Sequence, residues 1–190
     1  MMIRILHKLL QGFRIYKYRL LSDISFVSGK FSLFQPVLLK GKGKIIIGSG
    51  CELGVLRSPN LYSSYAYIEA REPSAVIRIA NNVRINNNFS LIANASEISI
   101  GNSVLIGYNC SISDSDFHRL SLEDRLKDDP VSKPVKIGDN VFIGNAVIIL
   151  KGVSIGENAV IGAGSVVVSD IPKNAIAVGN PARVIKSIEV

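Results

Sequence analysis

The chain lacks several features that mark particular classes of protein. Its 190 residues include no tryptophan and only 7% aromatic residues, which argues against a core built around large rings. The only two cysteines, Cys51 and Cys110, lie in apolar stretches, which favours buried thiols over a disulfide framework or a metal site. No cleavable signal is apparent either. These absences predict a protein of the reducing cytoplasm with a core of small aliphatic side chains.

The remaining composition suits one folded domain. Hydrophobic residues make up 47% and charged residues 19%, which argues against a disordered chain and allows a continuous core. The formal net charge of +7 suits a membrane surface, a nucleic acid or a phosphorylated cofactor, because all three present anionic groups. A nucleic acid ranks last, since no basic stripe interleaved with aromatic residues is present.

Residues 1–21 combine helical spacing of apolar side chains with frequent basic residues. The apolar positions are Met2, Leu6, Leu9, Leu10, Phe13, Tyr16 and Leu20. Because charges recur too often for a membrane span of about 20 apolar residues, the pattern predicts an amphipathic basic helix. We expect this helix, within a cap over residues 1–40, either to cover the open end of the main body or to contact the inner membrane face.

A six-residue period dominates residues 41–178. It runs without interruption from Val135 to Ile171, where aliphatic residues recur at Ile137, Ile143, Ile149, Ile155, Ile161 and Val167. An α-helix would send these side chains to different faces, and ordinary strands have a period of two. The pattern predicts instead an all-β fold, a parallel β-helix with triangular coils of three short strands each, whose aliphatic side chains share one axis.

Polar segments interrupt and end this period. Pairs such as Asp139-Asn140 and Glu157-Asn158 are typical of turns and mark the expected corners of the coil. Residues 113–134 are polar and charged, which predicts an exposed loop extruded from the coil. After the prolines and glycine that end the repeats, residues 179–190 form a C-terminal segment that we expect to be helical.

A known family shares this pattern. The resemblance is carried by the run KIGDNVFIGNAVIILKGVSIGENAVIGAGSVVVSDIPKNAIAVGNPARVIKSI, which is similar to the C-terminal half of hexapeptide-repeat acetyltransferases of the maltose, galactoside and capsular or lipopolysaccharide sugar type. It is specific over about residues 100–188 and looser over 44–99. The resemblance implies a left-handed coil, a homotrimer with active sites between subunits, and acetyl transfer from acetyl-CoA to a sugar hydroxyl in surface polysaccharide biosynthesis.

The resemblance also implies a catalytic histidine on the extruded loop, and His118 in SDSDFHRL occupies the matching place. Such a base is needed because a sugar hydroxyl is a poor nucleophile at neutral pH, and a positioned imidazole typically contributes about 10²–10⁴-fold. Asp114 and Asp116 are both close enough in sequence to orient the ring; we favour Asp116 and assign Asp114 to the acceptor site. An acceptor contact maps onto Asn88, although asparagine is also common at structural corners.

For acetyl-CoA, the resemblance implies contacts at Asn145, Ala163, Val168, Ser169, Arg183 and Lys186. Small residues at corners would let the pantetheine arm lie along the coil beside backbone amides, and basic residues near the end would meet the phosphates. The same small residues serve corner geometry in any such coil, and the basic pair could equally be solvated. Family members often carry Thr-Lys where this chain has Val168-Ser169, so we expect main-chain contacts there.

Several other functions fit the same coil. A serine acetyltransferase usually carries a second histidine in the loop, and none follows His118. An aminosugar N-acetyltransferase usually has an added nucleotide-binding domain, for which residues 1–40 are too short. A zinc-dependent carbonic anhydrase needs three imidazoles per metal, so we expect no metal. A purely structural coil stays open as well, although the extruded loop favours an enzyme.

Overall fold

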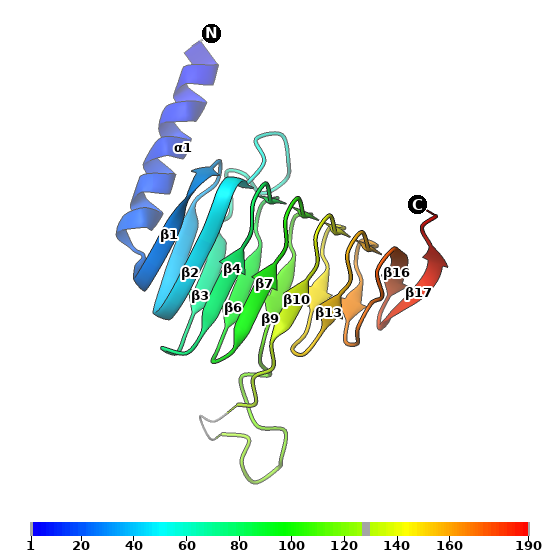
Figure 1. The fold of residues 1–190 in the computed structure, drawn as a ribbon. Coiled ribbons are helices and arrows are strands. Elements are labelled where there is room, and N and C mark those ends of the chain that lie inside the picture. The colour runs from blue at the N-terminus through cyan, green and yellow to red at the C-terminus, as the bar shows by residue number, and fades with distance from the viewer. Residues whose placement is uncertain (1, 127–129, 190) are drawn as a thin grey trace.

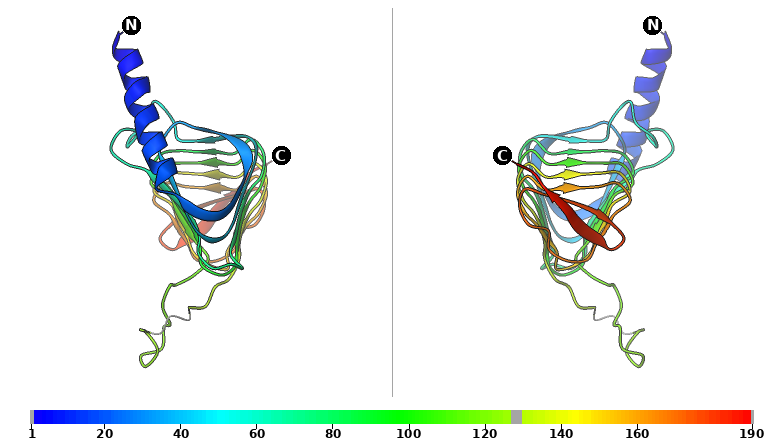
Figure 2. Two further views of the ribbon diagram at one scale, coloured as in Figure 1. Left: turned by 90° about the vertical axis from the view of Figure 1, so that its left-hand side faces the viewer. Right: turned by 90° about the vertical axis from the view of Figure 1, so that its right-hand side faces the viewer.

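The chain winds into one coil of parallel strands with a helix at its first end (Figure 1). The computed structural model describes residues 2–126 and 130–189, with helix side chains from Leu9 onward, so the predicted positions of Met2 and Leu6 lie outside the described side chains. Viewed along its axis, the coil is triangular (Figure 2). The fold is the left-handed parallel β-helix that the period and the resemblance predicted.

Strands of successive coils stack into three faces. The first face holds β4 (Val76–Ile79), β7 (Glu97–Ile100), β10 (Val135–Ile137) and β13 (Ser154–Ile155). The second holds β5 (Arg84–Ile85), β8 (Leu105–Ile106), β11 (Phe142–Ile143), β14 (Val160–Ile161) and β16 (Ala175–Gly179). The third holds β3 (Ala66–Ala70), β6 (Ser90–Ala93), β9 (Ser111–Ser113), β12 (Ile148–Ile149) and β15 (Val166–Val167). The long β2 (Val37–Leu53) pairs with all three faces in turn.

The core is a column of aliphatic side chains along the coil axis. Ile137 pairs with Ile155, and Ile143 pairs with Ile161, so one coil takes eighteen residues. These isoleucines are all buried, Ile143 and Ile161 completely. Full burial of one such side chain contributes roughly 1.5–3 kcal/mol, and each coil repeats the same contacts with its neighbours. The predicted axis-facing positions are therefore confirmed.

Asparagines hold the corner between the first and second faces. Asn140 and Asn158 have φ values of 55° and 59°, in the left-handed region that asparagine tolerates better than most residues. The Nδ2 of Asn140 donates to Oδ1 of Asn158 at 2.9 Å, and Nδ2 of Asn158 donates to Oδ1 of Asn174 at 2.8 Å. This ladder confirms the corners predicted at the Asp-Asn and Glu-Asn pairs.

Parallel pairing begins before residue 41, where the coil was predicted to start. β1 (Asp23–Leu33) lies within the stretch assigned to the cap, yet it pairs with β2 from Asp23 opposite Lys40 to Leu33 opposite Leu53. Most side chains of β1 are exposed, so this strand needs no aliphatic period and shows none in the sequence. The coil thus starts directly after α1 (Met2–Leu20).

The expected helix at residues 179–190 is wrong. β17 (Ala182–Ser187) is a strand that runs antiparallel to β16. The last coil would otherwise leave a row of backbone groups of β16 unpaired at its edge, and β17 pairs with them. Gly179, with a φ of 104°, lies at the reversal between the two strands.

The extruded loop is present where it was predicted. Residues 114–126 and 130–134 lie between β9 and β10 and extend away from the coil on the side opposite α1 (Figure 1). In the regular coils the equivalent connection takes only a few residues, for example residues 150–153 between β12 and β13.

Candidate active site

The residues predicted to take part in catalysis or ligand binding lie mainly at two corners of the coil. The second–third corner links the second face to the third and comprises residues 86–89, 107–110, 144–147 and 162–165. The third–first corner links the third face to the first and comprises residues 71–75, 94–96, 114–134, 150–153 and 168–170. The extruded loop is the longest segment of the third–first corner, and its first residues carry His118.

Asp114 anchors the exit of the loop. Its side chain is fully buried, and its carboxylate accepts hydrogen bonds from the backbone N–H groups of Asn94 (2.6 Å), Ala95 (3.3 Å) and Ser96 (2.8 Å). Its carbonyl oxygen accepts from Lys133 N at 2.8 Å, which closes the loop base. In one chain Asp114 therefore has a structural role, because both of its carboxylate oxygens accept backbone hydrogen bonds; its predicted acceptor contact stays a prediction.

Asp116 pairs with Lys151 from the same corner of the next coil. Lys151 Nζ donates to Oδ2 of Asp116, and also to Val131 O at 3.3 Å. The two side chains are 19% and 28% exposed, so water screens this pair less than an ion pair on the open surface. Within the described residues, no hydrogen bond joins Asp116 to His118, and the ring-orienting role of Asp116 stays a prediction.

His118 is the first exposed residue after this anchored segment. Phe117 before it has a φ of 62°, an uncommon value for an aromatic residue, and its N–H donates to Ser115 Oγ at 3.0 Å. The guanidinium of Arg71 lies over the Phe117 ring, 5.0 Å from its centre. In the part of the chain that the structure describes, the imidazole itself makes no hydrogen bond or ion pair.

Asn88 lies at the second–third corner, across the third face from the loop. Its φ is 58°, its Nδ2 donates to Asn109 Oδ1 at 2.8 Å, and its N–H donates to Gln35 Oε1 at 3.0 Å. These contacts are those of a corner residue. Within one chain, the third face separates Asn88 from His118, so a site that uses both needs a second copy.

The residues predicted to hold acetyl-CoA are divided in the same way. Asn145 and Ala163 lie at the second–third corner, where Gly164 N donates to Asn145 O at 2.8 Å. Val168 and Ser169 are exposed at the third–first corner. In one chain these two pairs thus lie on opposite sides of the third face, with β15 between Ala163 and Val168.

The two predicted basic contacts lie on β17. Arg183 and Lys186 are both exposed, and the Nη1 of Arg183 donates to Ala182 O at 2.8 Å. They thus lie beyond the last coil, opposite Val178 and Ile176 of β16.

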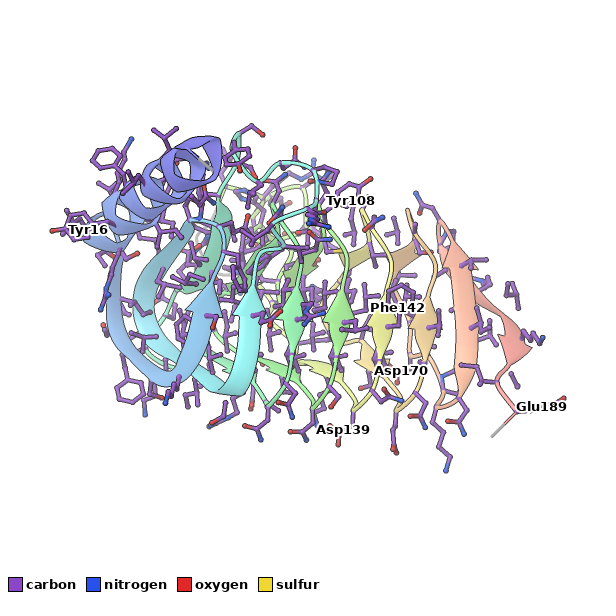
Figure 3. All side chains as sticks on the ribbon, turned by 90° about the horizontal axis from the view of Figure 1, so that it is seen from above. Tyr16, Tyr108, Asp139, Phe142, Asp170 and Glu189 are labelled. Carbon is purple, nitrogen blue, oxygen red and sulfur yellow. The ribbon has the colours of Figure 1, made fainter. Side chains whose placement is uncertain are left out.

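Apolar side chains point outward on both sides of the second–third corner. On the second face, Phe142 and Leu105 are 48% and 46% exposed, and on the third face Ile148 is 41% exposed. Figure 3 shows Phe142 in the middle of the second face, with Tyr108 at one edge and Asp139 at the other. Exposed ion pairs lie nearer the first coils, Arg78 with Glu97 at 3.0 Å on the first face and Arg84 with Glu52 at 2.6 Å on the second. Apolar surface of this kind is typical of contacts between protein chains.

The cysteines are packing groups, as predicted. Both are buried free thiols, and burial raises the pKa of Cys51 and of Cys110 above the ordinary thiol value. Cys110 Sγ donates to Gly144 O at 3.1 Å. Among the described residues, no group of three or more His, Cys, Asp or Glu side chains could hold a metal ion.

Sequence reasoning did not identify Lys151, Arg71 or Phe117. Lys151 lies where Leu150 breaks the usual isoleucine-glycine order of the repeats, which is the one sequence signal that marks its corner. Arg71 lies 46 positions before Phe117, in the part of the chain where the period is broken. Their proximity depends on how the coils stack, which no local pattern reports.

Comparisons with known proteins relate this chain to acetyltransferases. The family described as "Bacterial transferase hexapeptide (six repeats)" matches residues 134–169. A Saccharomyces cerevisiae protein named as a candidate acetyltransferase is 39% identical over 162 residues, which are 84% of this chain and 77% of the yeast protein. Galactoside O-acetyltransferase of Escherichia coli is 41% identical over 122 residues; these are 62% of this chain and 60% of that protein, less than two thirds of its length.

A solved structure extends the likeness to three dimensions. Galactoside acetyltransferase in complex with coenzyme A superposes with a TM-score of 0.52 at 32% sequence identity. The match covers 87% of this chain and 66% of the other.

Proposed function

This chain belongs to the hexapeptide-repeat acetyltransferase family, and on that premise we propose that it transfers an acetyl group from acetyl-CoA to a sugar hydroxyl in surface polysaccharide biosynthesis. The observation that carries the proposal is His118, exposed at the end of a segment that Asp114 and the pair Asp116 with Lys151 anchor to the coil. The likeness to galactoside O-acetyltransferase supports a sugar acceptor.

His118 acts as the general base in this proposal. The unprotonated ring nitrogen accepts the proton of the acceptor hydroxyl while the hydroxyl oxygen attacks the thioester carbonyl carbon of acetyl-CoA. The tetrahedral intermediate then collapses, the carbon–sulfur bond breaks, and the new ester remains on the sugar. The imidazolium returns its proton to the departing CoA sulfur. We keep Asp116 as the carboxylate that orients the ring.

A homotrimer completes the site. Two different apolar faces flank the second–third corner, and a closed ring of three copies can pair the second face of one with the third face of the next. Phe142, Leu105 and Ile148 would then be covered. Acetyl-CoA would lie between Asn145 and Ala163 of one copy and Val168 and Ser169 of another, with Arg183 and Lys186 near its phosphates and Asn88 near the acceptor.

The test is release of free CoA thiol in the presence of acetyl-CoA and a panel of galactosides, maltose and aminosugars. We expect His118→Ala to lower kcat by about 10²–10⁴-fold, the usual contribution of a positioned base. The matched control is His7→Ala, the other histidine of the chain. Unchanged turnover in His118→Ala would end the proposed mechanism. Transfer to amines with no use of hydroxyl sugars would assign the chain to N-acetylation instead.

We also propose that α1 contacts the inner membrane. The helix turns polar groups toward the coil, since Gln11 is 7% exposed and its Nε2 donates to Phe34 O at 2.7 Å, while Arg14 Nη1 donates to Leu61 O at 2.7 Å. Its apolar residues face outward instead, with Leu9, Leu10, Phe13, Tyr16 and Leu20 all exposed.

The charge of the helix suits an anionic surface. α1 contains no acidic residue, and Lys17 and Arg19 lie in its last turn. An exposed apolar side beside cations is typical of helices that lie in the interface of anionic membranes. No helix of the described residues is long and apolar enough to cross a bilayer.

Co-sedimentation with vesicles tests this contact. We expect the chain to sediment with vesicles that contain anionic lipids and to lose most of this binding in Leu10→Asp/Phe13→Asp. The control is Leu120→Asp/Leu122→Asp, which adds the same two charges at exposed leucines of the extruded loop. Equal binding to anionic and neutral vesicles, or binding that the double variant retains, would contradict the proposal.

A further inference from the structure

A polar groove opens at the third–first corner, beside the stretch of coil that contacts the extruded loop. Its volume is about 680 Å³, and its lining includes Asp23, Lys40, Lys42, Tyr67, Glu69 and Arg71. Small-molecule sites typically measure about 300–1,000 Å³. None of these residues belongs to the predicted site: Asp23 lies on β1, Lys40 and Lys42 on β2, Tyr67 and Glu69 on β3, and Arg71 directly follows β3.

The charges of this groove balance one another. Lys40 Nζ lies 2.9 Å from Asp23 Oδ2, and Arg71 bonds both carboxylate oxygens of Glu69, at 3.1 and 3.0 Å. Lys42 and Glu72 add one charge of each sign. The groove therefore presents many hydrogen-bonding groups with no net charge.

Tyr67 adds a hydroxyl to this set. Partial burial, and secondly the charge of Glu69, raise the pKa of Tyr67 above its ordinary value. The phenol therefore stays protonated at neutral pH and can act as a donor or an acceptor.

Arg71 links the groove to the extruded loop. Its guanidinium donates two hydrogen bonds to Glu69 and lies over the ring of Phe117, 5.0 Å from the ring centre. A cation over an aromatic ring is attracted by its face, and a two-point carboxylate contact fixes the guanidinium plane. Phe117 keeps a left-handed backbone, φ 62°, immediately before His118. The contact between Arg71 and Phe117 therefore lies one residue before His118 and can influence where the His118 side chain is held.

We propose that the groove is the acceptor subsite, that it binds an uncharged, hydroxyl-rich sugar segment, and that Arg71 is a positioning residue that holds His118 beside it through Phe117. The proposal rests on the proposed function and deepens it. Sugar hydroxyls both donate and accept, which matches carboxylates and basic groups that stand side by side. An anionic sugar would meet Glu69 and Glu72 with no excess of cations to compensate.

Binding is tested first, in protein that cannot turn over. In the His118→Ala background we measure dissociation constants for methyl galactosides and maltose by NMR titration, with sialic acid as the anionic probe. Tyr67→Phe removes a hydroxyl, and Glu72→Gln replaces a charged hydrogen-bond acceptor by a neutral amide. Each should weaken binding of the neutral sugars by about 3- to 10-fold, the usual effect of losing or weakening one hydrogen bond. The control Glu97→Gln removes a carboxylate from the first face and should change nothing. Tighter binding of sialic acid, or no effect of either groove variant, overturns the subsite.

The positioning role is tested by turnover in otherwise native protein. Arg71→Met should lower kcat at least tenfold while leaving the KM for acetyl-CoA unchanged, and Arg71→Lys should restore part of it because a cation remains over Phe117. Arg78→Met breaks the comparable Arg–Glu pair on the first face and is the control for stability. A kcat that Arg71→Met does not change, or a loss matched by a lower melting temperature than the control, overturns the role.

Different results would contradict the acceptor subsite and the proposed histidine mechanism. If the groove binds neutral sugars but His118→Ala does not affect turnover, the proposed mechanism is wrong and the subsite stands. If His118→Ala abolishes turnover and the groove variants change neither binding nor KM for the acceptor, the mechanism stands and the subsite is wrong.

Discussion

The two ends of the coil are built on the same triangle but differ in regularity. From Val135 to Ile171 the strands have two or three residues and coils follow one another without insertion, whereas β2 near the beginning has seventeen residues and residues 54–65 leave the coil as a loop. The regular end contains the stretch matched by the family, residues 134–169, and most of the predicted acetyl-CoA contacts. The irregular end contains the polar groove. The regular coils thus carry most of the predicted co-substrate contacts, and the features particular to this chain lie where the repetition is broken.

The largest expected difference between the two ends concerns side-chain burial. Ile143 in the regular end is fully buried, whereas Phe26 on β1 is 47% exposed. Ile143→Ala should lower the free energy of unfolding by about 2–5 kcal/mol through lost burial and a cavity. Phe26→Ala should change it by no more than about 0.5 kcal/mol. Urea denaturation at one fixed protein concentration measures both, and similar losses would show that β1 is as tightly packed as the regular coils.

A smaller difference is expected between two glycines. Both have positive φ values, 111° for Gly41 and 72° for Gly164. A Cβ added at Gly41 would lie 1.9 Å from Ala70 O, whereas at Gly164 it would meet nothing within 4 Å. Gly164→Ala should therefore cost only the left-handed backbone penalty, about 1 kcal/mol, and Gly41→Ala should cost more because backbone must shift. Equal melting temperatures of the two variants would contradict the close packing at β2.

The smallest expected effect concerns the thiols, one in each part of the chain. Because burial raises both pKa values, less thiolate is present at pH 8 than in a free cysteine, and alkylation of the native protein should be slow and should accelerate as pH rises. In low urea Cys51 should react before Cys110, since it lies nearer the end covered by the mostly exposed β1. Mass spectrometry after iodoacetamide treatment reports the order of reaction. Earlier reaction of Cys110 would show that the coil opens more easily around Cys110 than at the end near β1.

Prediction from sequence succeeded where the chain repeats itself. Ile137 and Ile155 are chemically equivalent and eighteen residues apart, so their common axis follows from spacing alone, and so does the loop that interrupts it. It failed at the C-terminal segment, where β17 forms because an open edge of β16 needs partners. An edge is a property of the assembled coil and leaves no period in the sequence.

The candidate site, like the fold, could be predicted from the sequence only in part. The position of His118 on the extruded loop could be found from the sequence and the family resemblance. The burial of Asp114 and the pairing of Asp116 with Lys151 could not, because these contacts join residues from different coils. The resemblance implied sites between subunits, and a single chain places Asn88 and Asn145 at a different corner from the loop; that further copies bring these corners together stays a proposal.

The sequence by itself determined the triangular coil, the residues on its axis and the existence of an extruded loop, because a six-residue period turns equivalent aliphatic side chains toward one axis. The left hand of the coil came from the family resemblance. The tertiary structure alone decided how the loop is anchored, which partner holds Asp116, and that Arg71 reaches Phe117. Those contacts depend on the lengths of the corners and the stacking of the coils, which bring together side chains that lie far apart in the chain.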